Sequence, residues 1–179
     1  VAPHAGYPFS GATLGYAYAR IKGKRCRRVI LVGVSHYHSF EGCSIIREGV
    51  FSTPLGDFPV DAVFASSLCE CVTVASAEFH TREHCLEIHL PFLEAAVGVA
   101  SIVPILLGKG PSPMGVLLAK QLAEKAGKDD LLIASTDLSH RLSEPQAHEM
   151  DGRTIETVMS QDWQKLARGI AARSCSMCG

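Results

Sequence analysis

The sequence lacks the features that mark membrane-spanning or secreted proteins. Among its 179 residues no apolar run approaches the roughly 20 residues of a membrane span, and the first residues resemble neither a signal peptide nor a transit peptide. Neither sign of charge is in excess: the formal net charge is -1, which gives no electrostatic reason to expect nucleic acid or an anionic membrane as a partner. The seven cysteines lack the regular spacing of a disulfide framework. They favour free thiols in a reducing compartment, so we expect a cytoplasmic location.

What the sequence does contain is enough apolar material for a core. Apolar residues make up 47% of the chain and charged residues 20%, and neither repeats nor a linker divide it. We therefore expect a single domain over residues 1–179. The chain starts on what reads as the last residues of a strand and ends abruptly at Cys178-Gly179. These ends predict an incomplete domain, without its N-terminal strand and its C-terminal part.

Apolar runs alternate with amphipathic segments, and this alternation predicts an α/β fold with a mostly parallel central sheet flanked by helices. Continuous β-branched or leucine-rich runs predict buried strands, with shorter ones between them. Pro104 favours an edge, a bulge or a strand start for its run. Pro91 interrupts a helical pattern, so the segment 83–97 is either two short helices or one kinked helix. The expected strands are 29–34, 45–46, 50–51, 101–108 and 131–134, and the expected helices are 10–19 capped by Ser10, 61–69 capped by Asp61, 83–97, 113–126, 145–159 and 163–172.

Polar side chains gather where the strand-like runs stop. His4 lies in Ala2–Tyr7, His36 follows the run 29–34, and Asp137 with His140 follows the run 131–134. Because ligands bind outside the carboxyl ends of strands in open α/β sheets, these clusters predict one shared site, most simply a metal site. Taken alone, a histidine on a turn such as His4 is more often structural than a ligand, whereas His36 fits a structural role and a ligand role equally well. Asp137 and His140 could form a general acid/base couple, or they could hydrogen-bond to the ligands of a metal. Alternatively, Asp137 only caps a helix and His140 has no functional role.

Two further groups carry ligand-type side chains. The segment Glu83–His89 is rich in them, but His84 and His89 are five residues apart and do not share a helix face, unlike the two histidines of the His-Glu-x-x-His zinc pattern. Whether this segment touches the site stays open. Cys175 and Cys178 form a Cys-x-x-Cys pair that follows a helix and has no second pair at matching spacing. Neither a structural zinc site nor a thioredoxin-like centre is therefore favoured.

Taken together, the motifs resemble the Memo-like family, named for mediator of ErbB2-driven cell motility, whose prokaryotic members are called AmmeMemoRadiSam system protein B. The resemblance extends over essentially the whole chain, and it depends on the order of six motifs. They are Ala2-Pro3-His4-Ala5-Gly6-Tyr7, Gly33-x-Ser35-His36, Thr53-Pro54-Leu55-Gly56, Glu83-His84-x-x-Glu87-x-His89-Leu90-Pro91-Phe92, Ser135-x-Asp137-x-x-His140 and Cys178-Gly179.

The resemblance implies a fold like the LigB-type class III extradiol dioxygenases and a divalent metal, Fe(II) first and copper or zinc as alternatives. It implies His4, His36 and Cys178 as the metal ligands. Asp137 and His140 would line the same pocket in catalytic roles, as would His84. The implied function is metal binding at a non-haem iron or copper type site, with metal-dependent redox or dioxygenase-like activity on a small-molecule or peptide ligand. The alternative is a non-catalytic binding or signalling protein whose pocket holds a phosphopeptide, another peptide or a metal.

Overall fold

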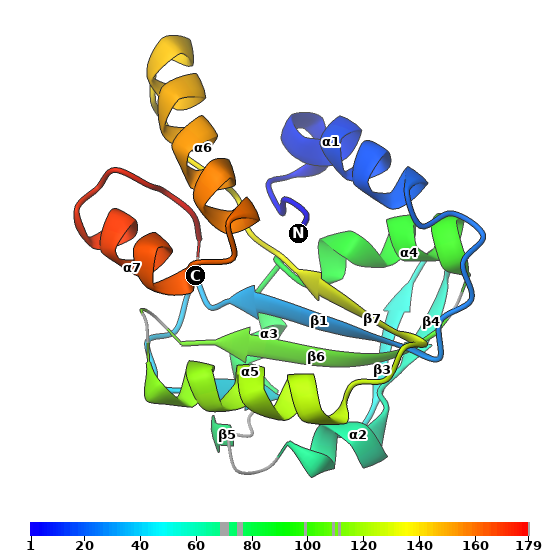
Figure 1. Ribbon diagram of the computed structural model, residues 1–179. Coiled ribbons are helices and arrows are strands. Elements are labelled where there is room, and N and C mark those ends of the chain that lie inside the picture. Colours follow the sequence, from blue (N-terminus) through cyan, green and yellow to red (C-terminus); the bar gives the residue numbers. More distant parts are fainter. Residues whose placement is uncertain (69–71, 75–76, 99, 109, 111, 179) are drawn as a thin grey trace. The chain divides into compact units, whose positions relative to one another are not determined.

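The computed structural model describes residues 1–68, 72–74, 77–98, 100–108, 110 and 112–178 (Figure 1). These residues form two units: Val1–Ser135, which contains the sheets, and Thr136–Cys178, which is helical. None of the described helices has the length and apolar character of a membrane-spanning segment.

The first unit is built on a five-stranded, mostly parallel sheet in the order β5-β2-β6-β1-β7. Strand β1 pairs in parallel with β6 on one side and with β7 on the other, and β2 pairs in parallel with β5. Among the described strands of this five-stranded sheet, only β2 and β6 form an antiparallel pair. The predicted α/β class is confirmed. The strands are β1 (Arg28–Val34), β2 (Cys43–Ile45), β5 (Val72–Val74), β6 (Ser101–Leu107) and β7 (Asp130–Ala134).

Helices cover both faces of this sheet, which explains why the strand sequences are continuously apolar. Helices α1 (Tyr7–Ala19) and α4 (Leu90–Val97) lie on one face, and α2 (Ala62–Ser67) and α5 (Pro113–Lys125) lie on the other (Figure 1). Successive residues of a strand point to opposite faces, so alternate residues of β1 belong to two separate cores. Val29 and Leu31 join the α1/α4 core, whereas Ile30 joins the α2/α5 core.

Pro104 lies inside the central strand β6, so the expectation of an edge, a bulge or a strand start was wrong. Pairing on the β2 side is interrupted at this point. Ile45 pairs with Ile105, and the next contact on that side is the bridge between Val60 and Ile102. Proline lacks the N–H that a ladder needs, and the interruption provides a place for it.

Two helices begin at residues other than those predicted. Helix α1 starts at Tyr7 rather than Ser10, whose hydroxyl instead donates to the carbonyl oxygen of Ala5 (2.5 Å). Helix α4 starts only at Leu90, preceded by the short 3-10 helix η2 (Glu87–His89), and residues 83–86 are not helical. Pro91 lies in the first turn of α4, where proline is well tolerated. It therefore begins this helix instead of interrupting it.

In the middle of the unit the predicted strand at 50–51 is present and longer, and a second strand and a short helix that were not predicted follow it. Strand β3 (Val50–Thr53) pairs with β4 (Gly56–Pro59) as an antiparallel hairpin, and α3 (Glu78–Thr81) is a single turn. The cap of α2 is as predicted, because the Asp61 carboxylate accepts the Phe64 N–H (2.9 Å). The helix ends at Ser67; its predicted extension to Cys69 falls outside the described residues.

The second unit contains α6 (Glu144–Met159) and α7 (Trp163–Ala171), which pack against each other. The segment after α7 is attached to both helices by hydrogen bonds. The N–H of Cys175 donates to the Gly169 carbonyl (3.1 Å), and the N–H of Ser176 donates to the Thr154 hydroxyl (3.0 Å). These bonds hold the residues that lead to Cys178.

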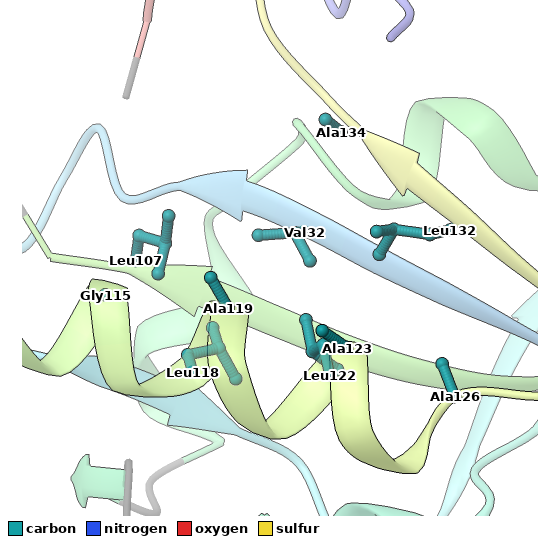
Figure 2. Close-up of a pocket in the computed structure, with 10 residues that line it drawn as sticks. All are labelled: Val32, Leu107, Gly115, Leu118, Ala119, Leu122, Ala123, Ala126, Leu132 and Ala134. Carbon is teal, nitrogen blue, oxygen red and sulfur yellow. The ribbon is translucent and has the colours of Figure 1, made fainter. Parts of the chain in front are cut away.

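A hollow in the first unit lies between α5 and strands β1, β6 and β7 (Figure 2). It has a volume of about 450 Å³ and is lined by aliphatic side chains and glycine, among them Val32, Leu118 and Leu132. No titratable or metal-binding side chain lines it. This hollow therefore offers no group for acid/base chemistry or metal binding.

Candidate metal centre

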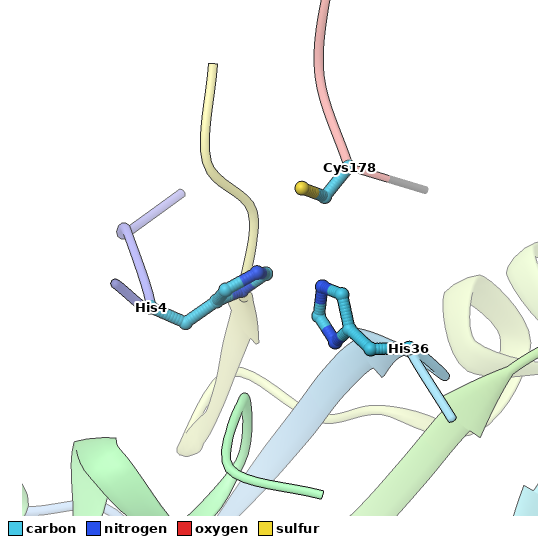
Figure 3. A group of neighbouring side chains, drawn as sticks. All are labelled: His4, His36 and Cys178. Atoms are coloured by element: carbon cyan, nitrogen blue, oxygen red, sulfur yellow. The ribbon is translucent and has the colours of Figure 1, made fainter. Parts of the chain in front are cut away.

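Two of the predicted ligands meet at the carboxyl ends of β1 and β7. His36 follows β1 by two residues. His4 reaches the same region because Ala2 pairs with Ser135, just after β7, and donates its N–H to the Ala134 carbonyl (2.9 Å). The ring centroids of His4 and His36 lie 5.0 Å apart, and the rings point towards one another (Figure 3). The sheet therefore brings together two imidazoles from separate motifs.

The carboxylate of Glu83 orients His36. One oxygen accepts a hydrogen bond from the His36 Nδ1–H (2.7 Å) and the other accepts from the His36 backbone N–H (2.7 Å). Burial would raise the pKa of the Glu83 carboxyl, but these hydrogen bonds outweigh it and hold the pKa below the usual range. Glu83 is therefore ionised and only accepts. The proton of a neutral His36 ring then resides on Nδ1, which leaves a lone pair on Nε2 for a metal.

His84 completes a group of three imidazoles in this unit. Its ring stacks on His36 with centroids 5.3 Å apart and meets His4 edge-on at 5.9 Å. Its backbone N–H donates to Glu83 (3.2 Å), and donor atoms of His36, Glu83 and His84 all lie within 4.8 Å of one another. The ring is half-buried, so it can reach both the two neighbouring histidines and solvent.

Gly33 makes this arrangement possible. A Cβ atom added at this strand position would lie 2.6 Å from the Cys85 Sγ and 2.9 Å from a Leu86 methyl carbon. Real Cβ atoms do not approach so closely, so only glycine lets the loop 83–86 lie against β1. That contact places Glu83 beside His36.

The remaining predicted residues lie together in the second unit. The Cys178 N–H donates to the Asp137 carbonyl (3.0 Å), and the Cys178 carbonyl accepts from the Thr136 hydroxyl (2.7 Å). The His140 Nε2 lies 3.5 Å from an Asp137 carboxylate oxygen. Cys178, also drawn in Figure 3, is half-buried, and burial raises the pKa of its thiol. The five cysteines described, Cys26, Cys43, Cys85, Cys175 and Cys178, are free thiols, as expected.

Glu83 is the functional residue that the sequence did not assign. It was visible as a carboxylate next to His84, but its partner His36 is 47 positions away. Helical periodicity would have grouped it with Glu87, and the absence of a helix over 83–86 removes that grouping. Ser135 likewise stood in a motif without a role, and its hydroxyl lies 2.8 Å from the His4 Nδ1.

The donor set fits a divalent transition metal. Imidazole nitrogens suit iron, copper and zinc, and the His36 ring is oriented by a carboxylate in the manner common for metal-bound histidines. The fold and these residues define an α/β protein with a histidine-based candidate metal centre at the carboxyl edge of a mostly parallel sheet.

The comparison with known families agrees with this description. The family model for Memo-like proteins matches residues 1–179, so the chain belongs to the Memo-like family. MEMO1 family proteins of Methanobrevibacter smithii and Thermotoga maritima are 34% and 33% identical to it, over 99% and 100% of the chain. That of Archaeoglobus fulgidus is 30% identical over 100%. The chain spans 65% of the first of these relatives, 66% of the second and 69% of the third.

Proposed function

We propose that this protein binds one divalent metal ion through His4, His36 and Cys178, with Fe(II) as the first candidate and copper or zinc as alternatives. The observation that carries the proposal is the pair of converging imidazoles, one of them held by an ionised carboxylate with its Nε2 left for a ligand. The assignment of Cys178 is supported by the family's motif order and by the affinity of thiolates for these metals.

Three protein ligands leave coordination positions open, as in metal sites that bind a substrate and unlike closed structural zinc sites. A bound redox-active metal would supply electron transfer or oxygen chemistry. The chain's own contribution is to orient the imidazoles and to move protons. His140 beside Asp137 is the candidate acid/base pair, because the His140 Nε2 lies 3.5 Å from an Asp137 carboxylate oxygen and a carboxylate so placed can orient an imidazole for proton transfer. His84 is a second candidate, because its half-buried ring lies against His36.

Metal analysis of the purified protein tests the proposal. We expect about one equivalent of Fe(II) or copper in the wild type, in line with a single site of this kind, and none in His36→Ala. His38→Ala is the matched control, because His38 lies two residues away and its ring contacts Phe79. Unchanged metal content in His36→Ala would reject the ligand assignment.

Oxygen consumption with catechol-type substrates separates the two functional interpretations. In the family resemblance the third ligand is Cys178, where ring-cleaving dioxygenases have a glutamate. We therefore expect little or no consumption, which favours metal-dependent chemistry of another kind or a binding role. Rapid metal-dependent consumption of O₂ with catechol would instead establish a dioxygenase.

A further inference from the structure

A series of buried side-chain hydrogen bonds connects His4 with Ser135, His89 and Tyr18. The Ser135 hydroxyl oxygen is 2.8 Å from the His4 Nδ1 and 2.9 Å from the His89 Nε2. The His89 Nδ1 is in turn 3.0 Å from the Tyr18 hydroxyl. All four residues are buried, and none is more than 4% exposed. They come from the N-terminal loop, α1, η2 and the end of β7.

The direction of every hydrogen bond in this series follows from one further contact. The Ser135 hydroxyl donates to the Cys85 carbonyl (2.6 Å), which can only accept. A serine hydroxyl has a single proton, so both imidazoles at Ser135 must donate to it. His4 therefore has its proton on Nδ1, and His89 donates from Nε2. The His89 Nδ1 then accepts from Tyr18, whose pKa is raised by burial, so that the phenol keeps its proton.

We propose that Ser135 and His89 are positioning residues that fix His4 in its Nδ1–H tautomer and so direct the Nε2 lone pair to the metal. The proposal rests on the proposed metal-binding function for its purpose, but the tautomer itself is independent of any metal. In the opposite tautomer the His4 Nδ1 lone pair would face the Ser135 oxygen, whose only proton is committed to Cys85.

The group that orients His4 differs in charge from the group that orients His36. A carboxylate orients His36, whereas a neutral hydroxyl orients His4. A carboxylate raises the basicity of the ring it binds, and a neutral serine oxygen does so less. The two imidazoles are thus set to the same tautomer by groups of different charge.

The tautomer is measured directly by long-range ¹H–¹⁵N NMR correlations of the histidine ring nitrogens in the metal-free full chain. The pH is kept above the ordinary imidazole pKa of about 6.5. We expect the His4 Nδ1 to show the shift of a protonated nitrogen and Nε2 that of a bare one. In Ser135→Ala both nitrogens should move to intermediate values, and Ser135→Thr should restore the wild-type pattern. A wild-type His4 protonated on Nε2, or an unchanged pattern in Ser135→Ala, would overturn the proposal.

Ser44→Ala is the matched control, because it removes another buried serine–histidine contact, with His80 (3.2 Å), outside this chain of bonds. It should leave the His4 nitrogens unchanged. If Ser135→Ala does not fold, the wild-type spectrum still tests the His4 tautomer, and Tyr18→Phe still tests the hydrogen-bond directions. Loss of the Tyr18 hydroxyl should shift the His89 Nδ1 signal, and an unchanged His89 pattern would contradict the assigned directions.

Titration with Zn²⁺ provides a second readout. We expect Ser135→Ala to weaken Zn²⁺ binding by about 10- to 100-fold, the usual effect of losing an outer hydrogen-bond partner of a ligand. His89→Gln, which keeps a donor towards Ser135 and an acceptor towards Tyr18, should lose less than His89→Leu. Unaltered Zn²⁺ affinity in Ser135→Ala would reject the role in metal binding. A wild-type protein that binds no metal would reject the proposed function. The NMR measurement would still test the His4 tautomer, because it is made without metal.

Discussion

Glu83 binds His36 twice, through the ring Nδ1 and through the backbone N–H, and both distances are 2.7 Å. A double contact fixes the ring and also the backbone that carries it. His36 can therefore neither rotate its ring nor shift its main chain without breaking a bond to a buried charge. A buried carboxylate left without these donors is costly, so the same contact stabilises the loop 83–86.

Glu83→Gln should weaken metal binding by about 10- to 100-fold. A glutamine has one accepting oxygen, so one of the two His36 N–H groups would face the amide NH₂ instead. Isothermal titration with Zn²⁺ measures the effect. Glu87→Gln is the control, because Glu87 lies four residues on and is exposed. Equal affinities of both variants would contradict the role of Glu83.

Alkylation of Cys178 should become slower when metal is bound, because a ligating thiolate is no longer available to the reagent. Mass-spectrometric mapping after iodoacetamide treatment, with and without Zn²⁺, measures the rate at each cysteine. Cys26 is half-buried like Cys178 and has no place in the proposed centre, so its rate should not change. Protection of Cys26 to the same degree would point to general stabilisation, and no protection of Cys178 would remove it from the ligand set.

The buried thiol of Cys85 should stay unmodified in the same experiment. Burial raises its pKa far above the ordinary value, so it presents almost no thiolate at neutral pH, and the side chain is inaccessible. Modification at the rate of Cys26 would show that the loop 83–86 opens readily.

Gly33→Ala should destabilise the protein by about 1–3 kcal/mol, the usual cost of overpacking. The added methyl would collide with the Cys85 Sγ and push the loop 83–86 away from β1. Urea unfolding measures the stability. Gly15→Ala is the matched control: its Cβ would meet no atom within 4 Å. Since Gly15 lies inside α1, alanine should stabilise there by up to about 1 kcal/mol. Equal effects at both sites would contradict the close contact at Gly33.

The stability of the first unit should fall in acid through Asp130. Burial would raise the pKa of this carboxyl, but hydrogen bonds from Arg27 and the Gly127 N–H and the charge of Arg28 lower it. A lowered folded-state pKa gives stabilisation that is complete above the unfolded value of about 3.9 and is lost as pH falls below it. Urea unfolding between neutral and acid pH should show this loss, and Asp130→Asn should flatten it. Asp129→Asn, at an exposed neighbour, should leave the dependence of stability on acid pH unchanged. If the wild type and both variants lost stability equally, Asp130 would not be the cause of the acid destabilisation.

The long strands β1, β6 and β7 were predictable because burial on both faces imposes an uninterrupted apolar run, as in residues 29–34. The short strands β4 and β5 have no such run and were not predicted. Pro104 was misread, since an interruption in pairing on one side cannot be seen in a single strand's sequence. The start of α4 was misread because Glu83 bonds to His36 and to the N–H of His84 instead of joining a helix. In both places a tertiary contact overrides the local pattern.

The meeting of His4 and His36 was predictable from the rule that side chains after parallel strands share one edge. Their orientation was not. It depends on Glu83 and Ser135, and no local spacing relates these residues to the rings they hold. The hydrogen-bond directions need coordinates as well, because they follow from the Cys85 carbonyl, a backbone atom common to every residue.

The contact between His4 and Ser135 joins residues 131 positions apart. We expect long-range contacts of this kind to form late in folding, because a large loop must close before they gain any stabilisation. His4 acquires its orientation only after β7 has joined the sheet at its edge. A metal ion therefore cannot act as a template for the early steps of folding. It should leave the refolding rate nearly unchanged and slow unfolding instead. The bound ion would then stabilise the native state without stabilising the transition state of folding.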